Sequence, residues 1–369
     1  MKICVIGTGT MAKGIVKAFA AKMPVVMKSR TQASLDKTMA SFAKSYGKLV
    51  EKGKLTQETV DAILNNITTT TDYSAFADAD LVIEAAVENM QLKKDVFMEL
   101  DKICKPETIF ATNSSSLSIT EIAACTSRPT QFIGMHFFNP ADRMALVEVI
   151  KGQVTSDEVC KTIVDLSTSI GKTPVPVNEA PGFVVNRILI TMINEAVGIL
   201  ADGIASAEDI DKCMMLGANH PMGPLELGDL IGLDICLTIM RVMFDETKDS
   251  KYRPCPLLTK MVRAGSLGVK SGKGFYIYHE DGTKTYDFQY YDKDGYPVTL
   301  SGLSRTFNPE FWNYAKMISA LLRHEIPMES IINIIFFFFY KYMNCILCLK
   351  NCKNCSLQNR IYKKKNRQR

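Results

Sequence analysis

The 369-residue chain has little net charge, no leader-like run at its start and few histidines. It has no strong excess of one charge: 44 basic and 39 acidic residues leave a net charge of +5, and eight basic residues gather in the last twenty positions. The rest is close to neutral, which excludes the basic surface of a nucleic-acid-binding protein. A strand-like run begins at the third residue, so we expect no secretory leader and a cytoplasmic protein. Histidine is scarce, with four residues in all, so few side chains can carry protons near neutral pH.

The eleven cysteines do not have the pattern of a disulfide-rich protein, because most stand singly in apolar stretches. We expect seven of them to be reduced, buried packing residues: Cys4, Cys104, Cys125, Cys160, Cys213, Cys236 and Cys255.

Residues 1–182 alternate short apolar runs with longer amphipathic stretches. Strand-like runs include ICVIG at residues 3–7, ADLVIEAA at residues 79–86 and QFIGMHFFNP at residues 131–140. This rhythm is typical of a doubly wound parallel sheet, so we predict an α/β fold with a Rossmann-type first domain. Residues 34–54 carry apolar side chains at helical spacing and five lysines, which predicts a basic helix that can bind phosphate groups.

Residues 183–282 predict an all-helical second domain. A long apolar helix starts this domain, and a capping box at Ser206 and Asp209 starts the next helix. A third helix is expected over Glu226 to Glu246. The first helix is apolar around most of its circumference and needs cover from other helices or from a second subunit, so we expect a homodimer that forms through this domain.

The glycine fingerprint at residues 7–12 follows a strand-like run and precedes a helical one, the context in which it binds a dinucleotide. Gly7 permits a tight turn, Gly9 lets the backbone approach a pyrophosphate, and Ala12 takes the third position, where a small side chain allows close helix packing. The N-terminus of the helix adds amide donors and its dipole. The fingerprint therefore predicts a dinucleotide cofactor.

The second strand ends without the acid that usually holds the ribose hydroxyls of NAD. Ser29 takes its position and Arg30 follows, with Lys28 alongside. Without the acid a 2′-phosphate meets no repulsion, and Ser29 and Arg30 can both hydrogen-bond to it. We therefore expect a preference for NADP(H); the alternative is that Arg30 is a solvated turn residue and NAD is retained.

His136 ends a strand-like run at the carboxyl edge of the predicted sheet, where ligands bind in such folds. Oxidation of a secondary alcohol needs a base for the hydroxyl proton, and imidazole suits this task. Glu148 can return beside the ring and fix its tautomer, and Asn186, at the head of the long helix, can donate a hydrogen bond to a substrate oxygen. A lone histidine at a strand end is otherwise structural, and we interpret His220 as a structural loop residue.

Eight motifs together resemble the 3-hydroxyacyl-CoA dehydrogenase family, and most of all its bacterial 3-hydroxybutyryl-CoA branch. They are, in order, GTGTMAKG, VIEAAVE, ATNSSSLSIT, GMHFFNP, LVEVI, APGFVVNRILI, GANHPMGPLELGD and SGKGFY. The resemblance covers about residues 1–279 and is specific because the motifs occur together and in order.

The resemblance implies the interconversion of (S)-3-hydroxyacyl-CoA and 3-oxoacyl-CoA with NAD(P). It implies that His136 and Glu148 form the catalytic pair and that Ser115 and Asn186 contact the 3-oxygen of the substrate. Residues at cofactor-contacting positions of the family are Glu88, Lys93, Ser115, Asn139 and Lys270, and those at positions that meet coenzyme A are Ser41 and Lys48. Taken without the resemblance, Ser115 belongs to a run of three serines that can cap a helix, and Lys48 can be solvated.

The chain departs from the family's pattern between the two catalytic residues. Asp142, Arg143 and Ala145 interrupt a stretch that is usually apolar and basic, which bears on substrate affinity and removes no catalytic group. Two other functions are considered. The first is a sugar-acid dehydrogenase that acts on 3-hydroxy acids without coenzyme A, and the basic helix with Lys48 argues against it. The second is a non-catalytic protein of the same fold, and the presence of His136, Glu148 and Asn186 argues against it. We expect no metal site in the enzyme.

Residues 283–369 are an atypical extension. Part of this extension resembles a segment of vitamin B12-dependent ribonucleotide reductases, and no activity follows from that. The run IINIIFFFFYKYMNCILCLK at residues 331–350 is nearly long enough for a membrane anchor, and membrane binding is expected only in that case. Two Cys-x-x-Cys pairs can bind zinc but lie close together: Cys345, Cys348, Cys352 and Cys355. We favour a chimeric or out-of-frame extension of low complexity.

Overall fold

The computed structural model describes residues 1–286, 289–291 and 297–299. Contacts divide the chain into two units, Met1–Asp287 and Phe288–Arg369. The predicted anchor run and the two Cys-x-x-Cys pairs lie outside the described residues. All the sites considered below lie in the first unit.

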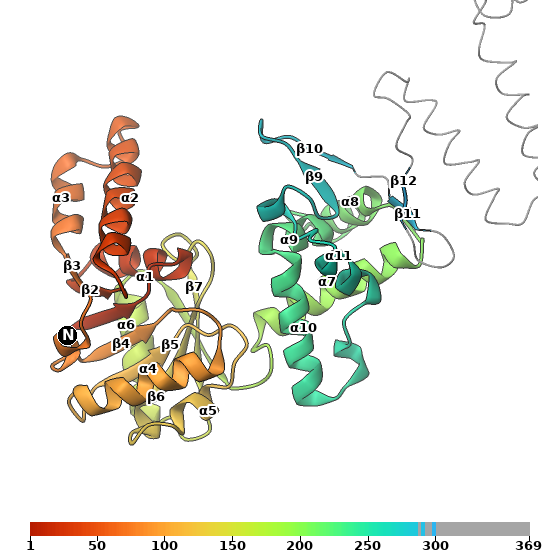
Figure 1. Ribbon diagram of the computed structural model, residues 1–369. Helices are drawn as coiled ribbons and strands as arrows, with labels where there is room; N and C mark the ends of the chain where they lie inside the picture. Colours follow the sequence, from red (N-terminus) through yellow and green to blue (C-terminus); the bar gives the residue numbers. More distant parts are fainter. Residues whose placement is uncertain (287–288, 292–296, 300–369) are drawn as a thin grey trace, which may run out of the picture. The chain divides into compact units, whose positions relative to one another are not determined.

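A single sheet of eight strands forms the centre of the N-terminal part, in the order β3-β2-β1-β4-β5-β6-β7-β8 (Figure 1). The strands are β1 Ile3–Ile6, β2 Val25–Lys28, β3 Ile67–Thr70, β4 Leu81–Glu84, β5 Ile109–Thr112, β6 Phe132–Phe137, β7 Leu146–Lys151 and β8 Thr173–Asn178. Neighbouring strands are parallel except β6 and β7, which are antiparallel. The predicted Rossmann-type sheet is confirmed, and the reversal between β6 and β7 is an unpredicted addition.

Helices cover both faces of this sheet, because successive side chains of a strand point to opposite sides. Ile3 and Val5 of β1 belong to the core beneath α1, α2, α3 and α6, while Cys4 and Ile6 belong to the core beneath η1, α4 and α5. The bounds are α1 Thr10–Ala20, α2 Gln32–Glu51, α3 Gln57–Asn65, η1 Tyr73–Phe76, α4 Met90–Ile103, α5 Ile119–Ala123, η2 Pro129–Gln131 and α6 Asp157–Ser169.

The predicted basic helix is α2. Thr31 caps its N-terminus by accepting a hydrogen bond from the amide of Ser34, and one face buries Leu35, Phe42 and Tyr46. Figure 1 shows α2 and α3 side by side, extending beyond the sheet edge that carries β2 and β3. The lysines of α2 are therefore exposed on an arm whose N-terminal end contacts the nucleotide fingerprint, where the hydroxyl of Ser34 lies 2.8 Å from that of Thr8.

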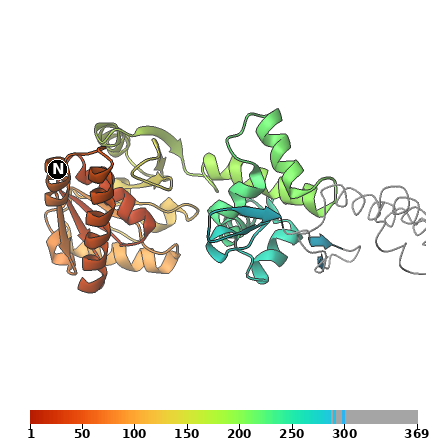
Figure 2. The same ribbon diagram turned by 90° about the horizontal axis from the view of Figure 1, so that it is seen from above.

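The part that follows β8 is mainly helical, as predicted, and is drawn in green to teal in Figure 2. Ser206 accepts a hydrogen bond from the amide of Asp209 at 3.2 Å, which is the expected cap of the second helix. The elements are α7 Val185–Ala201, α8 Ala207–Gly217, α9 Pro224–Ile231, α10 Leu233–Thr247, η3 Ser250–Tyr252, α11 Pro256–Arg263 and η4 Val269–Ser271. Short strands follow: β9 Tyr276–Tyr278, β10 Lys284–Tyr286, β11 Gln289–Tyr291 and β12 Pro297–Thr299.

Two details of this part differ from the prediction. The single helix expected over Glu226 to Glu246 is wrong, because α9 and α10 are separated at Gly232, whose φ of 105° cannot continue a right-handed helix. The antiparallel hairpin of β9 and β10 is an addition to the helices.

The seven cysteines predicted to be reduced are all free thiols. Those that are buried are Cys4, Cys104, Cys160 and Cys236, and those that are half-buried are Cys125 and Cys255. Cys213 is exposed, so the prediction of burial is wrong for it. The buried side of α8 is formed by Ala207, Ile210 and Asp211, and position 213 falls outside it.

Candidate active site

The glycine fingerprint joins β1 to α1 and forms the floor of a cavity of about 600 Å³. Gly7 has a φ of 120°, and a Cβ at this position would lie 2.7 Å from the carbonyl oxygen of Ala85, so no other residue fits. The same Cβ would lie 3.2 Å from the Cβ of Ala12, which explains why the third position of the fingerprint is small. The side of the turn that faces Ala85 and Ala12 is therefore tightly packed.

The upper side of the turn is suited to a pyrophosphate. A Cβ at Gly9 would meet nothing within 4 Å, so the backbone is open to an approaching ligand. Gly9 is also the N-cap of α1, which has neither a side-chain cap nor an acid in its first turn. The amides of that turn and the helix dipole are thus available to an anion, and the residues fit the phosphates of a dinucleotide.

The end of β2 lines the same cavity with Lys28, Ser29 and Arg30. The hydroxyl of Thr8 lies 3.5 Å from that of Ser29 and 2.8 Å from that of Ser34, so hydroxyl groups gather beside the exposed Arg30. Lys28 is only 7% exposed, and its Nζ lies 3.5 Å from the centre of the Tyr73 ring. Burial lowers the pKa of Lys28, an effect that Glu99 and Asp72 oppose. The cavity wall at this end is thus lined by basic side chains and by side chains that carry hydroxyl groups.

His136 and Glu148 are direct partners across the antiparallel pair β6 and β7. The Nδ1 atom of His136 lies 2.8 Å from Oε2 of Glu148, and both side chains are almost fully buried. Because a carboxylate only accepts, Nδ1 carries the proton of the neutral ring, and Nε2 is the atom left to exchange a proton. Glu148 lies twelve positions after His136, and the intervening return brings its carboxylate beside the imidazole.

The second oxygen of Glu148 accepts hydrogen bonds from the amides of Val184 and Val185, at 3.2 and 3.0 Å. These amides begin α7, which has no side-chain cap of its own. Burial acts to raise the pKa of Glu148, but the hydrogen bonds from His136 and from the two amides outweigh it and hold the pKa below its usual value. Glu148 is therefore ionised near neutral pH.

Asn186 and Ser115 meet at the start of α7. The side-chain amide of Asn186 donates to the carbonyl oxygen of Ser115 at 3.1 Å, so the loop after β5 and the first turn of α7 are joined. The amide of Ser115 in turn donates to Oε1 of Glu88 at 2.8 Å. The two residues that the resemblance assigns to the substrate oxygen are neighbours.

Glu88 organises the loop of three serines. Its Oε1 also accepts from the hydroxyl of Ser114 at 2.6 Å and from the amide of Ser116 at 3.1 Å. Burial raises the pKa of Glu88, but Lys93 and these donors together lower it below its usual value. Lys93 itself is 1% exposed; its Nζ lies 2.7 Å from Oε2 of Glu84 and 3.4 Å from Oε2 of Glu88. It faces carboxylates rather than open cavity, and a contact with the cofactor stays a prediction.

The other predicted residues lie on three further elements. Asn139 is exposed in the loop after β6, with a cis peptide bond to Pro140. Lys270, on η4, forms an ion pair with Asp234. Ser41 and Lys48 are exposed on α2, seven residues apart and so on the same face of the helix. Their contacts with cofactor or coenzyme A remain predictions.

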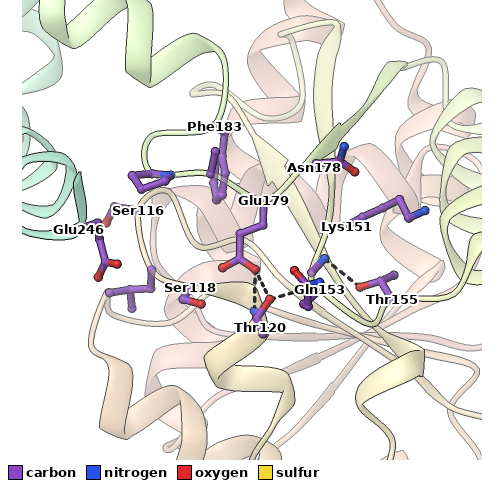
Figure 3. A pocket seen from close by; sticks show the side chains of 14 residues that line it. Ser116, Ser118, Thr120, Lys151, Gln153, Thr155, Asn178, Glu179, Phe183 and Glu246 are labelled. Carbon is purple, nitrogen blue, oxygen red and sulfur yellow. Dashed lines mark hydrogen bonds between the residues drawn. The ribbon is translucent and has the colours of Figure 1, made fainter. Parts of the chain in front are cut away.

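A second cavity of about 680 Å³, which we call the side pocket, lies next to the serine loop. Figure 3 shows its polar lining, in which Thr120 donates two hydrogen bonds to Glu179 and accepts one from the amide of Gln153 at 2.8 Å. Phe183 forms part of its wall and also packs against the ring of His136, with ring centres 5.7 Å apart.

Two residues at these cavities were not predicted from the sequence. Tyr73 lies on the short turn η1, which gives no periodic signal. Phe183 lies within the motif APGFVVNRILI, so the motif marks the segment, but nothing in the sequence reveals which way the ring points.

Within the part of the chain that the structure describes, no three histidine, cysteine, aspartate or glutamate side chains are arranged to hold a metal ion. In the same residues every helix is too short or too polar to cross a bilayer.

Three family models match the chain. The model described as 3-hydroxyacyl-CoA dehydrogenase, NAD binding domain matches residues 2–180, and the one described as 3-hydroxyacyl-CoA dehydrogenase, C-terminal domain matches residues 182–278. A third, described as NrdJ homologue C-terminal domain, matches residues 264–341 and overlaps the end of the second. The first two together account for the sheet and the helices described above.

Curated proteins and solved structures agree with these matches. The 3-hydroxybutyryl-CoA dehydrogenase of Clostridioides difficile is 59% identical over 281 residues, which are 76% of this chain and 100% of that protein. The human mitochondrial hydroxyacyl-coenzyme A dehydrogenase is 42% identical over 75% of this chain and 90% of its own length. The crystal structure of the (S)-3-hydroxybutyryl-CoA dehydrogenase from Ralstonia eutropha has a TM-score of 0.74 and 47% identity, over 76% of this chain and 99% of that one.

Proposed function

The chain belongs to the 3-hydroxyacyl-CoA dehydrogenase family, and from this premise we propose that it interconverts (S)-3-hydroxybutyryl-CoA and acetoacetyl-CoA with a nicotinamide dinucleotide. The observation that carries the proposal is the buried pair of His136 and Glu148, in which Nδ1 is bound by a carboxylate and Nε2 is left to exchange a proton. This is the group that oxidation of a secondary alcohol requires.

The nicotinamide, when bound, accepts or supplies the hydride. His136 takes the proton of the 3-hydroxyl group at Nε2 in the oxidative direction and returns a proton there in the reductive direction. Glu148 keeps the ring in the tautomer with a proton on Nδ1 and stabilises the imidazolium that forms. Because α7 donates two amides to Glu148, the carboxylate remains fixed while the charge on the ring changes.

The substrate oxygen is held by Ser115 and Asn186 in this proposal. The support is the hydrogen bond from the side-chain amide of Asn186 to the backbone carbonyl oxygen of Ser115, which joins the serine loop to the segment that donates two amides to Glu148. Ser41 and Lys48 on α2 are proposed to meet coenzyme A, with Lys48 as a point charge for phosphate. Glu88 is proposed to contact the cofactor as well as the serine loop.

We propose NADP(H) as the preferred cofactor. The support is the cavity wall at the end of β2, which carries basic and hydroxyl-bearing side chains. Ser29 and Arg30 occupy the positions where an acid is usual, and the buried Lys28 adds a further positive charge. A 2′-phosphate at this wall gains charge-assisted hydrogen bonds from Arg30 and meets no carboxylate of the strand end. NADP(H) favours the reductive direction.

A homodimer through the helical part is also proposed. Its support is a set of large apolar side chains that are exposed on α7 to α10 and on the turn after α7: Ile188, Ile204, Met215, Leu216, Leu230 and Ile235. Apolar surface of this kind is stabilised when a second subunit covers it.

The experiment is the reduction of acetoacetyl-CoA by the purified chain, with NADPH and NADH compared at matched concentrations. We expect turnover with NADPH favoured, a loss of about a hundredfold or more in His136→Ala, and no loss in His220→Ala, the matched histidine control. Replacing Ser29 by Asp and Arg30 by Ala together is expected to reverse the cofactor preference.

The outcomes separate the parts of the proposal. NADH favoured by the wild type would overturn only the cofactor preference. An absence of turnover with either cofactor would overturn the reaction itself and point to the sugar-acid or the non-catalytic alternative.

A further inference from the structure

Phe183 has an unusual backbone conformation. Its φ of 48° lies in the left-handed region, which a bulky aromatic residue rarely adopts. Among the described residues two other non-glycine residues share this region, Asn219 and Lys248, and both are exposed polar residues at the ends of helices. Phe183 is instead 4% exposed. An unfavourable conformation at a buried residue indicates that the surrounding structure needs the ring where it is.

The ring of Phe183 packs against the catalytic imidazole. Its centre lies 5.7 Å from that of His136, and the ring of Phe138 lies 4.6 Å from the imidazole. The two residues after Phe183 donate their amides to Glu148, so the same short segment holds both members of the catalytic pair. The position of the imidazole is thus defined by two aromatic rings and one carboxylate.

Phe183 also forms part of the wall of the side pocket. Figure 3 shows the ring at the edge of a lining that includes Ser118, Thr120, Gln153 and Glu179. A cavity of about 680 Å³ with this many polar groups is suited to hold water. His136 is not part of that lining although Phe183 contacts it, so the ring separates a polar cavity from the imidazole.

We propose that Phe183 is a positioning residue, whose ring orients the imidazole of His136 and closes it off from the side pocket. The proposal rests on the proposed function for its consequence, which is that the proton is exchanged with the substrate rather than with water of the side pocket. An imidazole that can rotate or is hydrated from the side is misplaced for proton transfer.

The test compares Phe183→Gly with Phe183→Leu. Glycine removes the ring and adopts the left-handed backbone easily, so the variant is expected to fold; leucine keeps apolar bulk at the same backbone cost. We expect kcat for acetoacetyl-CoA reduction to fall about tenfold or more in Phe183→Gly, with the KM for cofactor little changed, and to recover to near the wild-type value in Phe183→Leu. Lys248→Gly, the same change at another left-handed residue, is the matched control and is expected to leave kcat unchanged.

A second readout does not depend on activity. Deuterium exchange at the C2 position of histidine, followed by mass spectrometry, reports how freely water reaches each imidazole. We expect exchange at His136 to be faster in Phe183→Gly than in the wild type and unchanged in Phe183→Leu, while His220 and His279 exchange alike in all three proteins.

Unchanged exchange at His136 in Phe183→Gly would overturn the barrier, and unchanged kcat would overturn the positioning role. If the wild type shows no turnover, the proposed function fails, whereas the exchange measurement still decides whether Phe183 separates His136 from the side pocket.

Discussion

The sheet and the helical part each bury a carboxylate that accepts hydrogen bonds from two consecutive backbone amides, yet the pKa values of the two carboxylates are shifted in opposite directions. Glu148 accepts from Val184 and Val185, and its pKa lies below the usual value. Asp229 on α9 accepts from the amides of Phe275 and Tyr276, both at 3.0 Å. Burial, with a contribution from nearby Asp211, raises the pKa of Asp229 to about 6.

The difference lies in what else each carboxylate faces. Glu148 has an imidazole that can become cationic and the N-terminus of α7, and both favour its charge. Asp229 has the hydroxyl group of Tyr278 and another acid. It also lies against the backbone of Gly274, where a Cβ would come within 1.9 Å of its Oδ1. The first carboxylate is arranged for a reaction, and the second joins the loop before β9 to α9.

The largest expected effect is on the rate. Glu148→Gln presents an amide to Nδ1 of His136, which disturbs the tautomer, so we expect kcat to fall by about a thousandfold with KM changed only a few-fold. Steady-state kinetics of acetoacetyl-CoA reduction measures this. Asp229→Asn is the matched control, an acid-to-amide change in the other region, and is expected to retain kcat. Equal losses in both variants would break the comparison.

The next effect is on stability. Asp229→Ala leaves the amides of Phe275 and Tyr276 and the hydroxyl of Tyr278 without their buried acceptor, so we expect the free energy of unfolding to fall by about 3 kcal/mol. Urea denaturation at pH 7, followed by circular dichroism, measures it. A loss below that of Glu148→Gln would contradict a structural role for Asp229.

A smaller effect distinguishes the two carboxylates by pH. Between about pH 4 and pH 6 the folded chain holds a proton on Asp229 that the unfolded chain has released, so the contribution of this residue to stability decreases as the pH rises. Relative to Asp229→Asn, the wild type is expected to lose at most about 3 kcal/mol across this range. Urea titrations of both proteins at several pH values give the difference, and a difference that does not vary with pH would refute the raised pKa.

The smallest effect has the opposite sign. Because the pKa of Glu148 is lowered on folding, its contribution to stability is present above pH 4.5 and is lost as the pH falls through the folded-state pKa. Relative to Glu148→Gln, the wild type is therefore expected to lose stability on acidification, in the same titrations in which Asp229 gains it. The same slope for both residues would contradict the comparison.

Much of the nucleotide-binding part could be predicted, because its signals are local. Gly7, Gly9 and Ala12 are constrained by a turn that a few residues define, and Ser29 and Arg30 by the end of one strand. His136 and Glu148 could be paired because a return between adjacent strands is short. Each of these predictions depends on residues close together in the sequence.

What was missed depends on contacts that are distant in the sequence. The break at Gly232 replaces a helix whose apolar spacing continues through it, and only the positive φ shows the separation. The sequence position of Lys93 likewise does not reveal that its ammonium group lies between Glu84 and Glu88, and its contact with the cofactor stays a prediction. The pattern of residues also does not reveal that Phe183 takes a left-handed conformation. Tertiary packing decides all three.

The direct pairing of His136 with Glu148 across β6 and β7 also limits how this enzyme can change. Residues 142–145, the exposed end of the connection between the two strands, lie outside the ladder and after Phe138, whose ring packs against the imidazole, so their length and sequence can vary without parting the pair. A deletion of one residue inside β7 is different, since it would turn Glu148 to the opposite face of the sheet. Changes in substrate range can therefore come from the exposed connection, whereas the two strands must keep their register.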